Sequence, residues 1–247
     1  MVSTALAMIV SINQPAYLPW LGYFDRIARS DVHIVLDDVQ FEKNSFINRN
    51  KIATAKDPIW LTVPVRTKGR YGDLAISGLE TASNIHWRRK HWESIRLNYG
   101  RAPYFSEHAS YFERLYVSEW PHLNDLVGEI TRYLLNALGI GNKIVFSSEM
   151  GVTGRKQQLV LNLCKAVGAD TYLSGPVGRG YLDEDDFNSA GIALHYHDYH
   201  HPRYCQPHPT FRPYMAAIDL LFNHGPDSLA ILLGEQKADL RCQQSSL

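Results

Sequence analysis

Two apolar runs separated by one short helix constrain the fold of this chain most strongly. The first run covers residues 7–12 (AMIVSI) and the second residues 32–38 (VHIVLDD). Between them, apolar residues recur at the spacing of one helix face and predict a helix over about 21–30. Parallel strands need a crossover of this kind, and continuous apolar runs suit strands that are covered on both faces. The segment therefore predicts a βαβ unit.

The rest of the chain continues this alternation. Further strands are predicted at 59–65, 143–149, 171–175 and 191–197. Further helices are predicted at 84–100, 121–138, 216–225 and 226–234. Two more are predicted, one that ends at Gly168 and a short one that begins at residue 183. The pattern predicts an α/β fold with a mostly parallel, Rossmann-like sheet, helices on both faces, a helical and loop insertion at about 84–140, and a helical C-terminal part. We expect one domain over 1–234 and a polar tail over 235–247.

Composition narrows the class of protein. The chain has 247 residues, with 25 basic and 25 acidic side chains, so its charge balance does not favour nucleic acid. No apolar run approaches the length of a membrane span, and the first residues lack the basic segment of a signal peptide. Three cysteines are too few for a disulfide framework, which favours the reducing cytoplasm. We interpret Cys164 as a core thiol rather than a nucleophile.

The turn between the first strand and its helix, residues 13–22, is the first candidate for a binding site. It lies at the carboxyl end of a predicted parallel strand, where ligands bind in such sheets. Two prolines restrict it, and Gln14, Tyr17 and Trp20 offer hydrogen-bonding groups and a flat apolar wall. The favoured interpretation is substrate binding, and the alternative is an aromatic and proline staple that packs the turn onto the domain.

Two adjacent acids, Asp37 and Asp38, end the second strand. They would repel each other if both were buried, so at least one should face solvent, a cation or the amine of a ligand. The alternative is that both cap a loop.

Basic and amide side chains mix with aromatic residues at 43–52 and again at 87–91. Most of these charges are expected on a solvated face. Arginine offers a planar fork for carboxylate or phosphate, so some of these residues are predicted to bind an anionic group of a ligand. The candidates are Asn48, Arg49 and Lys51, with Lys90 and His91 in reserve.

Five of the eleven histidines fall between 195 and 208. On a strand, His195 and His197 would share a face and offer two metal ligands, but no third ligand follows at a zinc spacing, and no metal is assigned. The histidines could instead be surface imidazoles, or one of them could be a general base. His201, placed just after the strand, is the preferred base, since an imidazole titrates near neutral pH.

Three segments together resemble the WbqC-like family of bacterial proteins. They are QPAYLPWLGYFDRIARSDVHIVLDDVQFEKNSFINRN, GADTYLSGPVGRGYLDEDDF and HHPRYCQ…FRPYMAAIDLLFNHGPDSL. The resemblance spans about residues 9–233. Members of this family are found with genes for O-antigen, other surface polysaccharides and secondary metabolites, so the resemblance implies a role in such a synthesis.

A more distant likeness is to pantothenate synthetase and its nucleotidyl-transferase superfamily. In the place of its His-x-Gly-His turn, this chain keeps Gly22 and lacks both histidines, so ATP-dependent activation is not implied. Gln40 and Phe41 match the end of the Asn-Pro-x-Gln-Phe segment, which makes Gln40 a substrate-binding candidate. A third motif, which contacts ATP phosphates in that superfamily, implies phosphate or oxyanion contacts for Ser174, Gly175, Arg179 and Tyr181.

These features lead to an amide-forming transferase or ligase as the first hypothesis. It would pass an acyl or aminoacyl group to the amine of a small metabolite or a nucleotide-linked amino sugar. His201 would be the base, Asp37 or Asp38 would hold the ammonium, and Gln14 with Tyr17 would orient the substrate. No cofactor is assigned; the donor candidates are ATP, an acyl thioester and an aminoacyl donor such as aminoacyl-tRNA. The rival hypotheses are a nucleotide- or metabolite-binding protein without turnover and a scaffold of a biosynthetic complex, and the sequence does not indicate an oligomeric state.

Overall fold

The computed structural model describes residues 7–67, 69, 74–82, 86–208 and 210–235. The chain divides into two compact units. The first unit comprises 1–15, 22–39 and 141–200, and the second comprises 16–21, 40–140 and 201–247. The predicted insertion at 84–140 lies inside the second unit, and residues 236–247 of the predicted tail lie outside the described residues.

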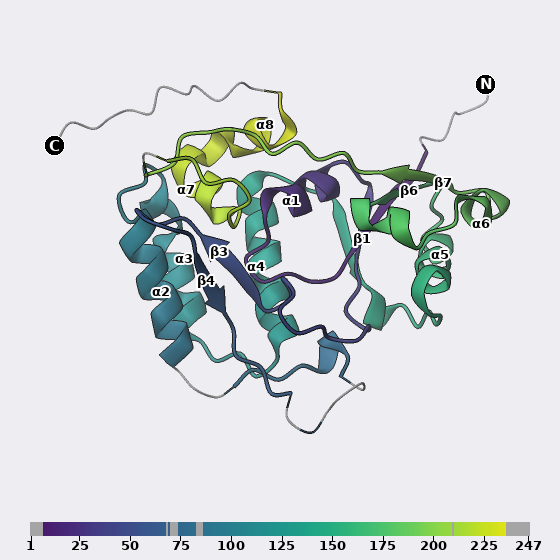
Figure 1. Ribbon diagram of the computed structural model, residues 1–247, viewed down its shortest axis with the longest axis horizontal. Helices are drawn as coiled ribbons and strands as arrows, with labels where there is room; N and C mark the ends of the chain where they lie inside the picture. Colours follow the sequence, from purple (N-terminus) through teal and green to yellow (C-terminus); the bar gives the residue numbers. More distant parts are fainter. Residues whose placement is uncertain (1–6, 68, 70–73, 83–85, 209, 236–247) are drawn as a thin grey trace. The chain divides into compact units, whose positions relative to one another are not determined.

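The first unit is built on a five-stranded sheet in the order β5-β2-β1-β6-β7, in which every pair of neighbours is parallel. Three of these strands, β1, β6 and β7, are labelled in Figure 1. Its strands are β1 (Ile9–Asn13), β2 (Val32–Val35), β5 (Lys143–Phe146), β6 (Thr171–Ser174) and β7 (Ala193–Tyr196). The predicted βαβ unit and the predicted parallel sheet are confirmed. The chain passes from β1 to β2 and β5 on one side of β1 and then crosses to β6 and β7 on the other side, so the strand order reverses between β1 and β6.

Helices cover both faces of this sheet. On one face, the apolar side chains of β1 and β2 pack in a core with Leu163 and Cys164 of α5 (Lys156–Ala166). On the other face, α1 (Leu21–Ala28) contacts polar side chains of the same strands, Asn13 and His33. A short helix, α6 (Glu184–Ser189), precedes β7. The sheet therefore has one apolar face and one face with buried polar groups.

The second unit is mainly helical and carries one antiparallel pair of strands. Its elements are β3 (Arg49–Ile52), β4 (Ile59–Thr62), α2 (His86–Tyr99), α3 (Phe105–Val117), α4 (Leu123–Leu138), α7 (Ile218–His224) and α8 (Ser228–Leu233). The amphipathic helix predicted at 121–138 is α4, and it ends at Gly139, whose φ of 73° suits a residue without a side chain. Among the described residues, no helix is long and apolar enough to cross a membrane.

Two elements of the second unit were not predicted. The buried stripe of α3 consists of Phe105, His108, Phe112, Leu115 and Tyr116, and its mixture of aromatic and polar residues does not form an aliphatic helical pattern. Strand β3 falls in the segment that the sequence marked only as basic, because two of its four side chains are charged. In both cases, packing within the unit decided the structure where the local pattern was weak.

Candidate functional site

Polar residues stand at or shortly after the carboxyl end of every strand of the first unit, along one edge of the sheet. Asn13 is the last residue of β1, Ser174 is the last of β6, and His197 follows β7. Asp37 and Asp38 follow β2, and Ser147 and Ser148 follow β5. We call this set of seven residues the carboxyl edge. Open parallel sheets bind ligands at such an edge, where the strand order reverses.

The two acids after β2 have different surroundings. Asp37 is buried and accepts hydrogen bonds from the backbone nitrogen of Ser148 at 3.0 Å and from its hydroxyl at 2.8 Å. Asp38 is exposed, and Ser147 donates its hydroxyl to it at 2.5 Å. One of the two acids therefore faces solvent, as their mutual repulsion predicts. Asp37 joins the ends of β2 and β5, and Asp38 is the carboxylate that a ligand can reach.

Arg26 of α1 lies between the ends of β1 and β6. Its side chain is buried, and Nη2 donates a hydrogen bond to Oδ1 of Asn13. A side chain at Gly175, directly after β6, would collide with Nη1 of Arg26. The guanidinium thus occupies the point where the strand order reverses, and Gly175 is required for this close approach.

The loop after β6 contains the residues that were predicted to contact phosphate or an oxyanion. Ser174 is buried, and a side chain at Gly178 would collide with its hydroxyl. Arg179 is exposed and stacks on the ring of Tyr196, with the guanidinium carbon 4.1 Å from the ring centroid. Tyr181 is 49% exposed. The structure thus places Ser174 and Gly175 near the strand ends and turns Arg179 onto β7.

His197, after β7, forms a pair with Asp25 of α1. Nε2 of His197 lies 2.5 Å from Oδ2 of Asp25, and both side chains are buried. Burial alone would raise the pKa of Asp25, but hydrogen bonds from His197 and Arg29 hold it below its usual value. Asp25 is therefore ionised, and it fixes the proton of His197 on Nε2. Among the described residues, Nδ1 of His197 has no hydrogen-bond partner.

A chain of buried hydrogen bonds runs under α1. Nδ1 of His33 lies 2.8 Å from the hydroxyl of Ser11, which lies 2.9 Å from that of Ser30. Ser30 donates to the carbonyl of Ile27, so Ser11 donates to Ser30 and accepts from Nδ1–H of His33. Burial, with a smaller effect of the Arg26 charge, lowers the pKa of His33 to about 3. His33 is therefore neutral, and Nε2 is its unprotonated nitrogen.

The carboxyl edge is too long for all its residues to contact one small group. Neighbouring strands lie about 4.8 Å apart, and β2 and β7 are three strands apart, which separates their ends by about 14 Å. A single small group therefore cannot contact both Asp38 and His197.

The aromatic residues of the predicted binding turn belong to the second unit. Tyr17 is fully buried, with its hydroxyl 2.7 Å from Nδ1 of His91 and 2.6 Å from the hydroxyl of Tyr116. The ring centroid of Trp20 lies 5.1 Å from that of Phe46. These contacts agree with the staple interpretation of the turn. Gln14, in the first unit, is half-buried, and its role in substrate binding stays a prediction.

The predicted basic and amide residues of the second unit mostly have contacts inside it. Asn48 donates to the carbonyl of Val63 at 2.8 Å. Arg49 and Lys51 lie 4.3 and 4.8 Å from the ring centroid of Trp60, which is partly exposed. The remaining candidates of this group are Gln40, which accepts a hydrogen bond from Leu74, and the exposed Lys90.

His201, the predicted base, also belongs to the second unit. Burial lowers its pKa to about 4, and the backbone nitrogen of Tyr214 donates to its Nε2 at 3.3 Å. Its role as a base stays a prediction. His195 is exposed on β7, and the described residues contain no group of three or more side chains that would hold a metal ion.

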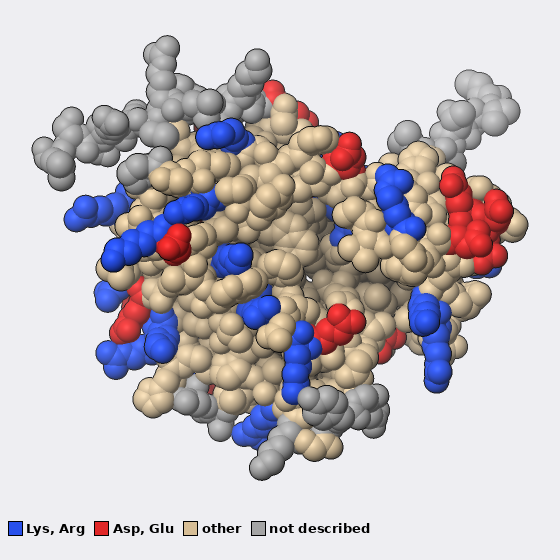
Figure 2. Space-filling view, viewed as in Figure 1, with Lys and Arg blue, Asp and Glu red and all other residues tan. Residues whose placement is uncertain are grey.

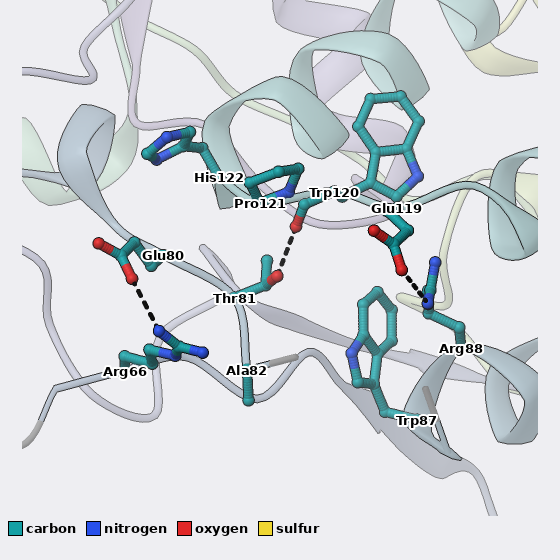
Figure 3. Close-up of a pocket in the computed structure, with 10 residues that line it drawn as sticks. All are labelled: Arg66, Glu80, Thr81, Ala82, Trp87, Arg88, Glu119, Trp120, Pro121 and His122. Carbon is teal, nitrogen blue, oxygen red and sulfur yellow. Dashed lines mark hydrogen bonds and ion pairs between the residues drawn. The ribbon is translucent and has the colours of Figure 1, made fainter. Parts of the chain in front are cut away.

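The second unit contains a separate pocket of about 260 Å³ (Figure 3). Its charges are paired: Arg66 lies 3.2 Å from Glu80, and Arg88 lies 3.7 Å from Glu119. Its lining residues are Arg66, Glu80, Thr81, Ala82, Trp87, Arg88, Glu119, Trp120, Pro121 and His122. Since acidic side chains already pair with these two arginines, the pocket attracts a charged ligand less strongly than the carboxyl edge does.

Sequence reasoning missed Arg26, His33 and the Asp25–His197 pair. The sequence feature that could have revealed these residues is the short helix at 21–28, which has only eight residues and connects two strands that are covered on both faces. A short crossover helix can be covered on several sides, and its charged residues are then buried as well. In the structure, every residue from Leu21 to Ile27 is buried.

Comparison with known proteins identifies a family and one relative of similar length. The model of the WbqC-like protein family matches residues 14–231. Uncharacterized protein Rv1507c of Mycobacterium tuberculosis is 37% identical over 224 residues, which cover 89% of this chain and 95% of that protein. No solved structure matches the chain.

Proposed function

The chain belongs to the WbqC-like protein family, and we propose that it is an amide-forming transferase or ligase of a biosynthetic pathway. It passes an acyl or aminoacyl group to the amine of a small metabolite or a nucleotide-linked amino sugar. The proposed location is the cytoplasm. The family match supports membership only, so the proposed chemistry rests on the residues of the carboxyl edge.

The observation that carries the proposal is the Asp25–His197 pair. Amide formation needs a neutral amine, and a base must remove a proton from the nitrogen before or during attack. Asp25 holds the Nε2 proton of His197, which leaves the lone pair on Nδ1. This is the arrangement in which a carboxylate orients an imidazole and stabilises the imidazolium that forms.

The reaction balances with these groups. The bound ammonium first loses one proton to solvent; the neutral amine nitrogen then attacks the acyl carbon, the new C–N bond forms, and the bond from the acyl carbon to its leaving group breaks. Nδ1 of His197 takes the nitrogen proton and returns it to the leaving group, which departs with its electron pair. The donor candidates remain an acyl thioester, an aminoacyl ester and an acyl phosphate formed with ATP.

The length of the carboxyl edge supports an extended substrate. With the amine at His197, the groups at the other end lie about 14 Å away, near Asp38. The exposed carboxylate of Asp38 suits hydroxyl groups, as acids at strand ends do with ribose. A nucleotide-linked sugar has both the length and the hydroxyl groups. In this proposal the ammonium is held at His197, and the predicted ammonium contact of Asp38 is an alternative for a second amine.

The test is a mass-spectrometric assay for amide products. Amino sugars linked to nucleotides are incubated with each donor class: acyl thioesters, aminoacyl-tRNA, and carboxylic acids with ATP. His197→Gln keeps a nitrogen donor for Asp25 and removes the base, so kcat should fall about 100-fold or more. His195→Gln changes an exposed histidine of the same strand and should keep wild-type kcat. Full activity of His197→Gln would refute the proposed role.

A binding protein without turnover is the second candidate. It is favoured by the first turn, where Tyr23 stands in place of a histidine and is fully buried. Such a protein would be stabilised by a nucleotide sugar in thermal unfolding and would yield no amide with any donor. A scaffold would show neither effect.

A further inference from the structure

Arg26 is a buried cation without an acidic partner among the described residues. It is 6% exposed, and its only hydrogen bond to another described residue is to Asn13. The titratable groups near it are the phenols of Tyr172, Tyr23 and Tyr181, which are neutral near pH 7. Asp25, its neighbour in sequence, is already paired with Arg29 and His197.

Two donors at this position lack acceptors. Nε of Arg26 and Nδ2 of Asn13 are buried and have no hydrogen-bond partner in the described part of the chain. Burying a charge or a donor without an acceptor is costly, and proteins normally avoid it. Both donors belong to residues at the point where the strand order reverses.

The missing partner is therefore an anion at the ends of β1 and β6. We propose that Arg26 and Asn13 bind a phosphoryl group of the substrate, as part of a nucleotide or a sugar phosphate. Gly175 supports this site because its missing side chain leaves the guanidinium room beside β6. A guanidinium offers two parallel donors to phosphate oxygens, and Nδ2 of Asn13 offers a third.

The charges on the face of the first unit seen in Figure 2 do not form a broad basic patch. In the view of Figure 2, acidic side chains gather at the right edge, over α6, whose first turn contains Glu184, Asp185 and Asp186. The basic side chains near them in this view are scattered rather than gathered in one patch. On this face an anion is therefore not attracted to a broad basic surface, and the proposal assigns its binding to Arg26.

This inference rests on the proposed function only in taking the carboxyl edge as the substrate site. It can be tested without turnover, with pyrophosphate as the probe at constant ionic strength. Binding is measured by isothermal titration calorimetry and by the shift of the melting temperature. Wild-type protein should bind pyrophosphate saturably and melt at a higher temperature in its presence.

Three variants define the site. Arg26→Met should reduce pyrophosphate affinity by about tenfold or more, because it removes the charge-assisted hydrogen bonds. Arg26→Lys keeps the charge without the planar fork and should bind pyrophosphate with an intermediate affinity. If the methionine variant does not fold, the lysine variant alone tests the role of Arg26. Arg155→Met removes an exposed arginine of the same unit and should leave the affinity unchanged.

Several outcomes would overturn the inference. They are the absence of pyrophosphate binding to wild-type protein, unchanged affinity in every Arg26 variant that folds, and binding of acetate as tight as that of pyrophosphate. If pyrophosphate binds through Arg26 and no amide product is found, the phosphoryl site stands and the proposed chemistry is wrong.

Discussion

The neutral state of His33 makes the stability of the protein depend on pH. Burial lowers its pKa to about 3 in the folded protein, whereas an unfolded chain gives histidine a pKa of about 6.5. The unfolded state therefore binds the proton first, and the folded state loses stability as the pH falls below 6.5. Between pH 7.5 and 5, linkage with these two values gives a loss of about 2 kcal/mol from His33 alone.

The perturbation is His33→Asn, whose amide can donate to Ser11 from about the place of Nδ1 and does not titrate. Urea unfolding at pH 7.5 and pH 5 should show that the variant loses about 2 kcal/mol less than wild-type protein. His91, whose pKa is also lowered to about 3 by burial, continues to contribute in both proteins. His195→Asn, at an exposed position, should keep the full wild-type pH dependence.

Two results would refute this reasoning about His33. One is a loss of stability on acidification that is the same in His33→Asn as in wild-type protein. The other is an NMR titration of wild-type protein in which the ring protons of His33 report a pKa above 5.

Three further predictions concern single residues. Burial raises the pKa of Asp219 to about 6, so the folded protein binds this proton more tightly than the unfolded chain does. In urea unfolding, wild-type protein should therefore gain about 1 kcal/mol of stability relative to Asp219→Asn between pH 7 and 5. An equal response of the two proteins would contradict the burial argument. Gly175→Ala should lower the free energy of unfolding by about 1–3 kcal/mol and weaken pyrophosphate binding, because the new methyl group displaces Arg26. Gly180→Ala, which has open space around its new methyl group, should change neither quantity. Burial raises the pKa of Cys164 to about 12, so iodoacetamide should label it, by peptide mass spectrometry, only after unfolding; rapid labelling of native protein would contradict its place in the core.

Most of the first unit could be predicted because its elements are encoded locally. The strands β1 and β2 are continuous apolar runs, and a parallel pair needs a crossover helix, so the βαβ unit follows from about thirty residues. The end of β2 also followed from a local argument, since two adjacent acids cannot both be buried without repulsion. Asp37 and Asp38 separate into one buried and one exposed side chain for this reason.

The candidate site was less predictable because its residues acquire their roles from long-range contacts. Nothing in the neighbourhood of Arg26 distinguishes it from a surface arginine of an amphipathic helix. It is buried because α1 is covered on nearly all sides, and it lacks a counterion among the described residues because Asp25 pairs with His197, 172 residues away in the chain.

The sequence by itself determined the class of the fold, the parallel sheet and the edge where polar residues collect, because apolar periodicity and strand ends are local properties. The tertiary structure alone decided which polar groups are buried, which of them have partners and which histidine has an oriented proton. Desolvation and hydrogen bonding depend on every neighbour in space, and those neighbours come from distant parts of the chain.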